Sequence, residues 1–282
     1  MKIDSFDGKN IHLFGGSSGI GLACVKASLH KGHKVIATAR NKSDLTKLRD
    51  LGAHAVALEL LDEGSVQQAA DEILKITDNR IDALFNNAGY GLQVAMEDTT
   101  WEALSDQHRI NVIGPIQLTN QLLPALPLGS KLLFNGSILG VITTAFRGPY
   151  CMSKHALEAA VDAYRIELEP NEIGVHLIQP GPIEASFRSN ALTVLKQTLN
   201  GRKTRLDYSN HLARLENTAL TKGTLPASSV ADIYMGIVEE THSNTRYLVT
   251  NTAKSAALLK RILGNRFHYI ARKSEVVRLN NQ

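Results

Sequence analysis

Residues 10–21 of the chain read NIHLFGGSSGIG, and this stretch decides the fold. The apolar run Asn10–Phe14 predicts a short buried strand, and the glycine turn Gly15–Gly21 leads into a helix that Gly32 stops. Glycines at such a turn allow the backbone to approach a phosphate closely, and the amino end of the helix supplies N–H donors. The stretch therefore predicts a dinucleotide-binding unit, although an ordinary glycine-rich turn between a strand and a helix would look the same.

The rest of the chain continues the alternation of strand and helix. Further strands are expected at residues 33–39, 53–60, 81–85, 131–134, 175–179 and 246–250; helices are expected at 43–51, 62–77 (capped by Asp62), 100–126 (bent near Pro115), 149–168 and 227–240. This alternation favours an α/β fold with a doubly wound parallel sheet and helices on both faces. With 282 residues, 43% hydrophobic content and no linker, we expect a single domain over 1–282.

Composition excludes several other classes of protein. The two cysteines, Cys24 and Cys151, cannot form a disulfide framework and lack metal-ligand spacing, so we expect no metal site and reduced thiols in a cytoplasmic protein. The acidic start argues against a signal peptide, and no run of 18 apolar residues predicts a transmembrane helix. The net charge of +4 gathers in two segments without interleaved aromatics, so no nucleic-acid partner is expected.

Tyr150 and Lys154 carry the strongest chemical signal. Residues four apart lie on one face of a helix, so the phenol and the ammonium project the same way. A nearby positive charge would lower the tyrosine pKa from about 10 toward working pH, and such a group can exchange a proton during carbonyl reduction. The pair alone would be better explained by chance on a surface helix. The functional interpretation of the pair is supported by three other segments, Asn86–Gly89, Ser137 and Pro180-Gly181. They also follow expected strands, and ligands bind at that edge of such a sheet.

The second strand indicates which nicotinamide cofactor is used. An NAD site usually presents an acid about 20 residues after the glycine turn, to hold the ribose 2′-hydroxyl. This strand ends Ala37-Thr38-Ala39-Arg40-Asn41-Lys42, without an acid. Arg40 offers a bidentate partner for a 2′-phosphate, with a solvated surface cation as the alternative. Glu59 comes too late for the ribose and, with Leu60, is expected to border the adenine, so we predict NADP(H) in preference to NAD(H).

Taken together, these motifs resemble those of the classical short-chain dehydrogenases/reductases over nearly the whole chain. They occur in the family's order and approximate spacing: Gly15-x-x-x-Gly19-x-Gly21, Asn86-Asn87-Ala88-Gly89, Asn111, Ser137, Tyr150 with Lys154, and Pro180-Gly181. The resemblance implies a single Rossmann-like sheet of about seven strands and a nicotinamide cofactor.

The resemblance also implies roles for individual residues. Tyr150 would donate the proton to the substrate oxygen, Lys154 would lower the phenol's pKa and hold the nicotinamide ribose, and Ser137 would polarise the substrate carbonyl. Asn111 would hold a water that links Lys154 to solvent. The expected cofactor-binding residues are Gly15, Ser17, Ser18, Gly19, Ile20, Gly21, Arg40, Glu59, Leu60, Asn87, Ala88, Gly89, Tyr150, Lys154, Pro180, Gly181 and Ile183.

Three positions depart from the family's usual pattern. Phe14 stands where a Thr often ties down the glycine loop, and Gly136 stands where a second Ser often precedes the catalytic one. Ala185 replaces a Thr that contacts the nicotinamide carboxamide, with Ser186 beside it. All three departures bear on the affinity and orientation of the cofactor.

The length and the ending narrow the resemblance to one branch. Residues 246–250, followed by a basic Ala/Leu-rich helix, are similar to the branch of hydroxysteroid and retinol dehydrogenases and bacterial aldehyde reductases. We therefore expect an NADPH-dependent reductase of an apolar aldehyde or ketone, reversible as an alcohol dehydrogenase and assembled as a homodimer or homotetramer. The alternatives are an oxidative hydroxysteroid or retinol dehydrogenase and a non-catalytic NADP-sensing protein.

Two further segments have predicted roles. Residues 184–226 form an insertion after a strand end, which is typical of a substrate lid. Residues 253–282 form a basic amphipathic tail with apolar residues three and four apart. We expect the tail to pack on its own domain or on a partner subunit, in preference to an anionic membrane surface.

Overall fold

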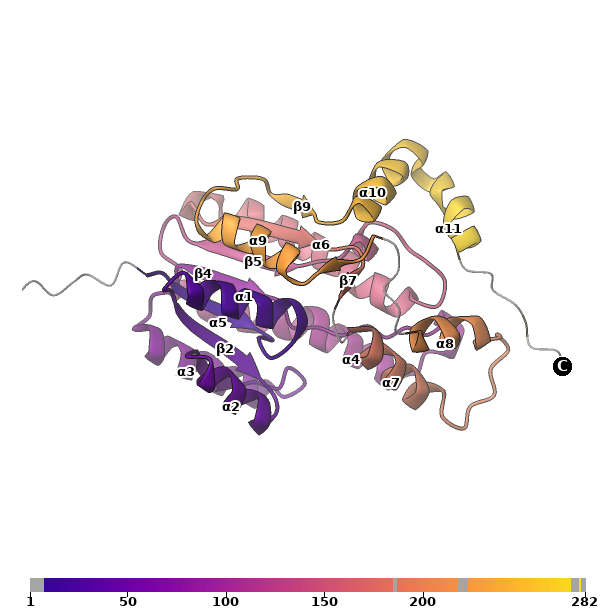
Figure 1. The fold of residues 1–282 in the computed structure, drawn as a ribbon, viewed down its shortest axis with the longest axis horizontal. Helices are drawn as coiled ribbons and strands as arrows, with labels where there is room; N and C mark the ends of the chain where they lie inside the picture. Colours follow the sequence, from indigo (N-terminus) through magenta and orange to yellow (C-terminus); the bar gives the residue numbers. More distant parts are fainter. Residues whose placement is uncertain (1–7, 185–186, 218–222, 275–278, 280–282) are drawn as a thin grey trace, which may run out of the picture.

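A parallel sheet forms the centre of the protein. The computed structural model describes residues 8–184, 187–217, 223–274 and 279 (Figure 1). Within these residues seven strands pair in the order β3-β2-β1-β4-β5-β6-β9, and every pairing is parallel. The predicted fold, a doubly wound α/β sheet of seven strands, is confirmed.

The elements follow one another as strand and helix along most of the chain. The strands of the central sheet are β1 (Asn10–Phe14), β2 (Lys34–Ala39), β3 (His54–Ala57), β4 (Ala83–Asn86), β5 (Lys131–Asn135), β6 (Gly174–Gln179) and β9 (Arg246–Leu248); β7 (Ile183–Glu184) and β8 (Leu225–Pro226) pair separately. The helices are α1 (Gly19–His30), α2 (Lys42–Asp50), α3 (Glu63–Thr77), α4 (Trp101–His108), α5 (Gly114–Leu122), α6 (Gly148–Glu167), α7 (Phe187–Leu199), α8 (Ser209–Glu216), α9 (Ser228–Val238), α10 (Asn251–Leu263) and α11 (His268–Ser274).

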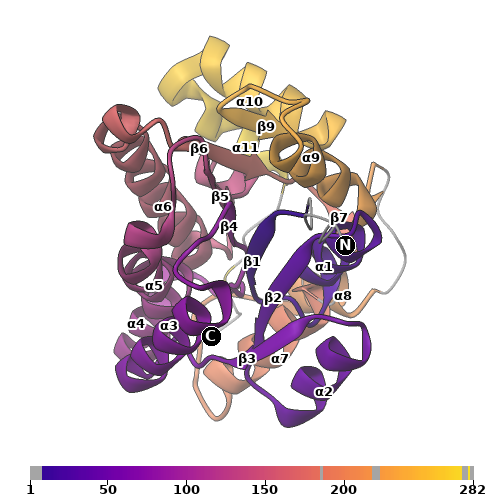
Figure 2. The same cartoon turned by 90° about the vertical axis from the view of Figure 1, so that its left-hand side faces the viewer.

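Helices cover both faces of the sheet and define two apolar cores. Helices α1, α2 and α9 pack on one face, and α3, α5 and α6 pack on the other (Figure 2). Alternation along a strand divides the side chains between them: Ile11 and Leu13 of β1 join the first core, whereas Phe14 joins the second. The helix cap predicted at Asp62 is also confirmed. The Asp62 carboxylate accepts hydrogen bonds from Gly64 N (2.9 Å) and Ser65 N (3.2 Å) at the start of α3.

The long helix expected over 100–126 runs without a break from Trp101 to Ala125, and its α-helical hydrogen bonding is interrupted just before Pro115. Helix α4 ends at His108, a π-helical turn follows at Arg109–Ile113, and α5 begins at Gly114. Pro115 has no N–H to donate, and its ring would crowd the carbonyl four residues earlier, so the wider turn falls just ahead of it.

The carboxyl ends of the central strands meet at one edge of the sheet. Gly15, Asn87, Gly136 and Pro180 follow β1, β4, β5 and β6 there. Helices α7 and α8 lie beyond this edge, and α10 and α11, drawn in yellow, stand past β9 (Figure 1). Among the described residues no helix is both long and apolar enough to cross a bilayer.

One buried side chain in β1 makes the fold sensitive to acid. The His12 ring is fully buried, edge-on to Phe14 with ring centroids 4.5 Å apart, and within the described chain neither ring nitrogen has a hydrogen-bond partner. Burial disfavours the charged imidazolium and lowers the pKa of His12 to about 3.

We expect the free energy of unfolding to fall as the pH drops from about 6.5 toward 3. In this window the unfolded chain gains a proton on His12 that the folded chain does not, which costs about 1.4 kcal/mol per pH unit. His12→Leu should flatten this slope in urea unfolding curves measured across the window. His54→Leu, at an exposed position of β3, is the control; parallel acid profiles for wild type and His12→Leu would contradict the prediction.

Candidate active site

The loop between β1 and α1 forms a narrow cradle of backbone. Gly15 and Gly19 have positive φ angles of +72° and +50°, which side-chain-bearing residues rarely adopt. A Cβ on Gly21 would lie 2.0 Å from Gly15 O and 2.6 Å from Asn87 Nδ2, so this position accepts only glycine. The Gly15 N–H donates to Thr38 Oγ1 (3.0 Å). Thr38 of the neighbouring strand thus anchors the loop. Phe14, which stands where the family often has an anchoring Thr, is buried in the core instead.

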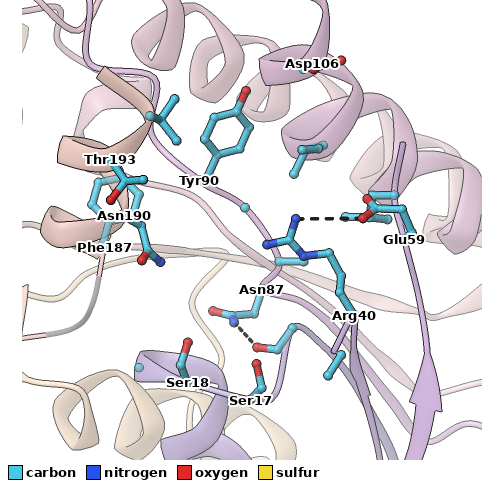
Figure 3. A pocket seen from close by; sticks show the side chains of 18 of the residues that line it. Ser17, Ser18, Arg40, Glu59, Asn87, Tyr90, Asp106, Phe187, Asn190 and Thr193 are labelled. Carbon is cyan, nitrogen blue, oxygen red and sulfur yellow. Dashed lines mark hydrogen bonds and ion pairs between the residues drawn. The ribbon is translucent and has the colours of Figure 1, made fainter. Parts of the chain in front are cut away.

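A cavity of about 870 Å³ opens from this cradle (Figure 3). Eleven of the residues expected to bind the cofactor line it: Gly15, Ser17, Ser18, Gly19, Ile20, Arg40, Glu59, Leu60, Asn87, Ala88 and Gly89. Thr38, Ala39, Leu58 and Tyr90 also line it, and the sequence analysis did not find these four. The glycine cradle, the amino end of α1 and the size of the cavity fit a dinucleotide.

The remaining expected cofactor residues lie behind the cavity wall or beside it. Gly21 supports the cradle, and Tyr150 and Lys154 are buried next to the cavity. Pro180 O accepts from Ile138 N (3.0 Å), so the loop after β6 holds the segment that follows Ser137. Ile183 pairs with Leu225 at the base of the lid. Ala185 and Ser186 lie outside the described residues.

Arg40 stands at the mouth of the cavity. Its side chain is 66% exposed, and its Nη1 lies 3.9 Å from Glu59 Oε2 (Figure 3). Glu59 itself is held by its Oε1, which accepts from Leu61 N (3.1 Å). An exposed pair at this distance contributes little to stability, so the guanidinium is free to turn toward an anion in the cavity.

Two asparagines connect the cradle to Lys154. Asn87 Nδ2 donates to Gly15 O (2.9 Å), and its Oδ1 accepts from Asn135 Nδ2 (2.9 Å). The carbonyl of Asn135 accepts from Lys154 Nζ (2.7 Å). Asn135 was not identified from the sequence; its place at the end of β5, two residues before Ser137, was the signal available.

Ser137, Tyr150 and Lys154 come together behind this network. The Ser137 side chain lies close enough to the Tyr150 phenol to act on its pKa as a hydrogen-bond partner, and Lys154 Nζ lies 5.9 Å from the centroid of the Tyr150 ring. Gly136, before the serine, packs against β6: a Cβ there would lie 2.9 Å from Leu177 Cδ1. The departure from the usual Ser therefore has a steric reason.

The expected lowering of the Tyr150 pKa was wrong. Burial raises the pKa of the phenol well above its usual value, and the Ser137 hydrogen bond opposes this only in part. Burial also lowers the pKa of Lys154 to about 8, although the Glu158 carboxylate works against the shift. The Phe187 ring packs on Tyr150 with centroids 5.3 Å apart, which helps to exclude water from the phenol.

Asn111 lies in the π-helical turn, and its side chain is committed to neighbouring residues. Its Oδ1 accepts from Tyr90 N (3.0 Å), and its Nδ2 donates to Tyr90 O (2.9 Å) and Ser153 Oγ (3.1 Å). Ser153 Oγ in turn donates to Tyr150 O (2.8 Å). Asn111 therefore fixes the start of α6 and the loop after Gly89, one step away from Lys154.

Described residues of the segment expected to form a lid make up one wall of the cavity. Asn190, Thr193, Gln197 and Arg202 of this segment line it. Two other bases of the segment have protein partners, since Lys196 pairs with Glu216 (2.7 Å) and Arg205 with Glu97 (2.6 Å).

Comparisons with known proteins agree with this geometry. The sequence matches the family model of the short chain dehydrogenases over residues 9–194. It is 34% identical over 261 residues to the uncharacterized oxidoreductase YbbO of Escherichia coli (strain K12), covering 92% of this chain and 91% of that protein. It is 32% identical over 229 residues to the NADPH-dependent 3-dehydrocapnine reductase of Ornithobacterium rhinotracheale, covering 77% of this chain and 79% of that protein.

Solved structures share the fold. A short chain dehydrogenase/reductase from Burkholderia phymatum, crystallised in complex with NAD, matches with a TM-score of 0.76 over 92% of this chain and 94% of that chain. The two sequences are 21% identical, so this likeness supports the architecture alone.

Gly21→Ala should disrupt the cradle. The added methyl group collides with backbone at Gly15, so we expect a loss of about 1–3 kcal/mol in the free energy of unfolding and a loss of NADPH binding. Thermal melts and NADPH fluorescence titration measure the two effects. Gly64→Ala, where the new Cβ meets only the Asp62 carboxylate at 3.3 Å, is the matched control. Unchanged NADPH affinity in Gly21→Ala would show that the nucleotide does not bind at this turn.

Proposed function

The chain belongs to the short chain dehydrogenase family and is a nicotinamide-dependent oxidoreductase of CH–OH and C=O groups, and from this premise we propose that it reduces an apolar aldehyde or ketone with NADPH. The observation that carries the proposal is the meeting of Ser137, Tyr150 and Lys154 behind the Asn87–Asn135 network, at the end of a cavity sized for a dinucleotide.

The cofactor would be held by the glycine cradle and by the residues that line the cavity. Gly15 to Gly21 and the amino end of α1 would bind the pyrophosphate, and Arg40 would bind the 2′-phosphate that distinguishes NADP(H) from NAD(H). When bound, the reduced nicotinamide supplies the hydride. The name of the 3-dehydrocapnine reductase relative supports NADPH, whereas the NAD complex of a structural neighbour keeps NAD as the alternative.

Tyr150 would protonate the substrate oxygen, and its neighbours would prepare it. The Ser137 hydroxyl would hydrogen-bond the carbonyl oxygen and polarise the bond. Lys154, anchored on the Asn135 carbonyl, would hold the ribose and remain mostly charged at neutral pH, since its pKa is about 8. Asn111 would position the start of α6 through its hydrogen bond to Ser153. It would also hold in place the water through which a proton passes between Lys154 and solvent.

The state of Tyr150 does not separate reduction from oxidation. Burial raises the pKa of the phenol, so it is protonated at neutral pH in the unliganded protein. The same rise makes the phenol a weaker acid and its phenolate a stronger base. An oxidative hydroxysteroid or retinol dehydrogenase therefore stays the alternative.

An aromatic side chain beside Tyr150 supports an apolar substrate. Phe187 lines the cavity and packs on the Tyr150 ring, with centroids 5.3 Å apart. Leu92, Val94 and Phe146 are buried in an apolar cluster with Leu195 and Tyr208, where the Phe146 ring lies edge-on to Tyr208 at 4.9 Å. That cluster is packed within the protein, so the apolar contact offered to a substrate is Phe187.

The intact group of Ser137, Tyr150 and Lys154 and the oxidoreductase relatives favour the enzyme over the NADP-sensing alternative. The homodimer or homotetramer and the cytoplasmic location stay predictions from the sequence.

Tyr150→Phe should lower turnover by at least ~100-fold, the usual scale for losing a positioned acid, while the variant still binds NADPH. NADPH oxidation against a panel of aldehydes, ketones and steroids measures the rate. Tyr164→Phe removes a hydroxyl from the same helix, where it donates to Asn120 Oδ1 (2.6 Å), and should retain activity. Equal rates for Tyr150→Phe and wild type would remove the phenol from the mechanism.

Arg40→Ala should weaken NADPH relative to NADH. Loss of charge-assisted hydrogen bonds worth about 1.5–3 kcal/mol corresponds to a rise of roughly 10- to 100-fold in the KM for NADPH, with the KM for NADH little changed. Steady-state kinetics with both cofactors measures the ratio. Arg49→Ala, on the exposed side of α2, is the control; an unaltered ratio in Arg40→Ala would assign cofactor choice to other residues.

A further inference from the structure

Helix α10 exposes most of its large apolar side chains to solvent. Leu258, Leu259 and Ile262 are 59%, 41% and 69% exposed. The face toward the protein consists mainly of small residues, with Ala253 buried and Ala256 and Ala257 half-buried; Lys260 and Leu263 are half-buried as well. A helix that served only the core of its own domain would show the reverse arrangement. The tail was expected to pack on its own domain or on a partner subunit, and these three side chains do not pack on their own domain.

The Lys and Arg residues of α10, α11 and the turn between them are not balanced by any acidic residue. From Asn251 to Ser274 the sequence contains six Lys or Arg and no Asp or Glu. The whole chain has 31 Lys and Arg against 27 Asp and Glu, so the rest of the chain carries 25 bases against 27 acids. On α10 the exposed Lys254 lies four residues before Leu258, and the exposed Arg261 lies three residues after it. Both bases therefore flank the apolar residues along the same side of the helix.

The next helix extends the pattern. Tyr269 and Ile270 of α11 are 52% and 45% exposed, and Arg272 lies over the Tyr269 ring at 5.2 Å. Phe267, between the two helices, is buried and fastens the region to the protein. Both helices stand clear of the sheet beyond β9 (Figure 1). Apolar and basic side chains thus share an outward surface that the described part of the domain does not cover.

We propose that this outward face of α10, formed by Leu258, Leu259 and Ile262 and flanked by Lys254 and Arg261, binds the surface of an anionic lipid bilayer. Apolar side chains in such a helix enter the boundary between headgroups and acyl chains, and the bases contact the lipid phosphates. A second copy of the chain suits the face less well. Two-fold packing of α10 on α10 would bring together two segments that each carry six bases and no acid.

The position of the face connects it to the site. Thr250 caps α10 by accepting from Ala253 N (3.0 Å), and the same threonine packs against Gly181, where a Cβ would lie 2.0 Å from Thr250 Oγ1. Gly181 belongs to the loop after β6 that holds the segment next to Ser137. A bilayer bound to α10 would therefore lie at the end of the sheet that carries the cavity, where apolar compounds are concentrated in lipid.

Flotation of the full chain with vesicles tests the proposal. We expect binding to vesicles of phosphatidylcholine mixed with phosphatidylglycerol at low salt, weaker binding at high salt, and little binding to phosphatidylcholine alone. Lys254→Glu with Arg261→Glu should lower the partition coefficient at least about tenfold. Lys26→Glu with Lys75→Glu, at exposed positions of α1 and α3, makes the same change in net charge and should keep binding.

The apolar part of the face has its own variants. Leu258→Ser with Ile262→Ser should also lower the partition coefficient at least about tenfold, since two buried apolar side chains are lost from the lipid contact. Thermal melting and NADPH binding establish that each variant is folded. Ile262→Trp in a Trp101→Phe background, which leaves one tryptophan in the chain, should show a blue shift of emission on anionic vesicles.

Three results would overturn the proposal. The first is no flotation of the wild type with anionic vesicles at low salt. The second is an equal loss of binding in the Lys26→Glu/Lys75→Glu control, which would make the attraction a matter of net charge alone. The third is self-association, measured by sedimentation, that Leu258→Ser with Ile262→Ser abolishes while vesicle binding is absent; this result would assign the face to a second copy of the chain.

Discussion

The carboxamide of Asn87 holds together the two halves of the site. It follows β4, the strand between β1 and β5, and bonds in both directions at once: to Gly15 O of the phosphate loop and to Asn135 Nδ2 at the end of β5. The Asn135 carbonyl then receives Lys154 Nζ. An amide can donate and accept together, which a carboxylate or an ammonium cannot, so asparagine suits a link between three strand ends. The spacing between the phosphate cradle and the catalytic helix therefore depends on this chain of polar contacts as well as on the apolar cores.

Burial around this network sets the protonation of the reactive groups. The same exclusion of water raises the pKa of Tyr150 and lowers that of Lys154, because in each case the charged form is the one that loses hydration. Glu158 moderates the second shift, and it is itself held by Gln179 Nε2 (2.7 Å) and by Arg246 (3.4 Å). The phenol is thus kept protonated by its environment, and the Glu158 carboxylate, on the next turn of α6, opposes the loss of the Lys154 proton.

Much of the fold and half of the site follow from local sequence, and the rest depends on contacts that no local pattern encodes. The strand Asn10–Phe14, the cap at Asp62 and the glycine turn are signals contained within a few residues, so they could be predicted. Thr38 and Asn135 act through neighbours in adjacent strands, and strand order was not predicted. The error on the Tyr150 pKa has the same origin, since the spacing of Tyr150 and Lys154 gives their common face but not the burial that Phe187 adds from the lid.

The tail shows a further limit of sequence patterns, because periodicity alone does not say which way an amphipathic helix faces. The apolar stripe of α10 was visible in the sequence, but only the structure shows that alanines pack inward and that Leu258 and Ile262 point out. The helix is also fixed rather than loosely appended: Thr250 joins its first turn to Gly181, and Pro180 joins that loop to Ile138, the residue after Ser137. A surface that captures α10 would therefore orient the whole catalytic edge. An enzyme whose substrates dissolve in lipid gains from such an orientation, because its cavity would open where the substrate is most concentrated.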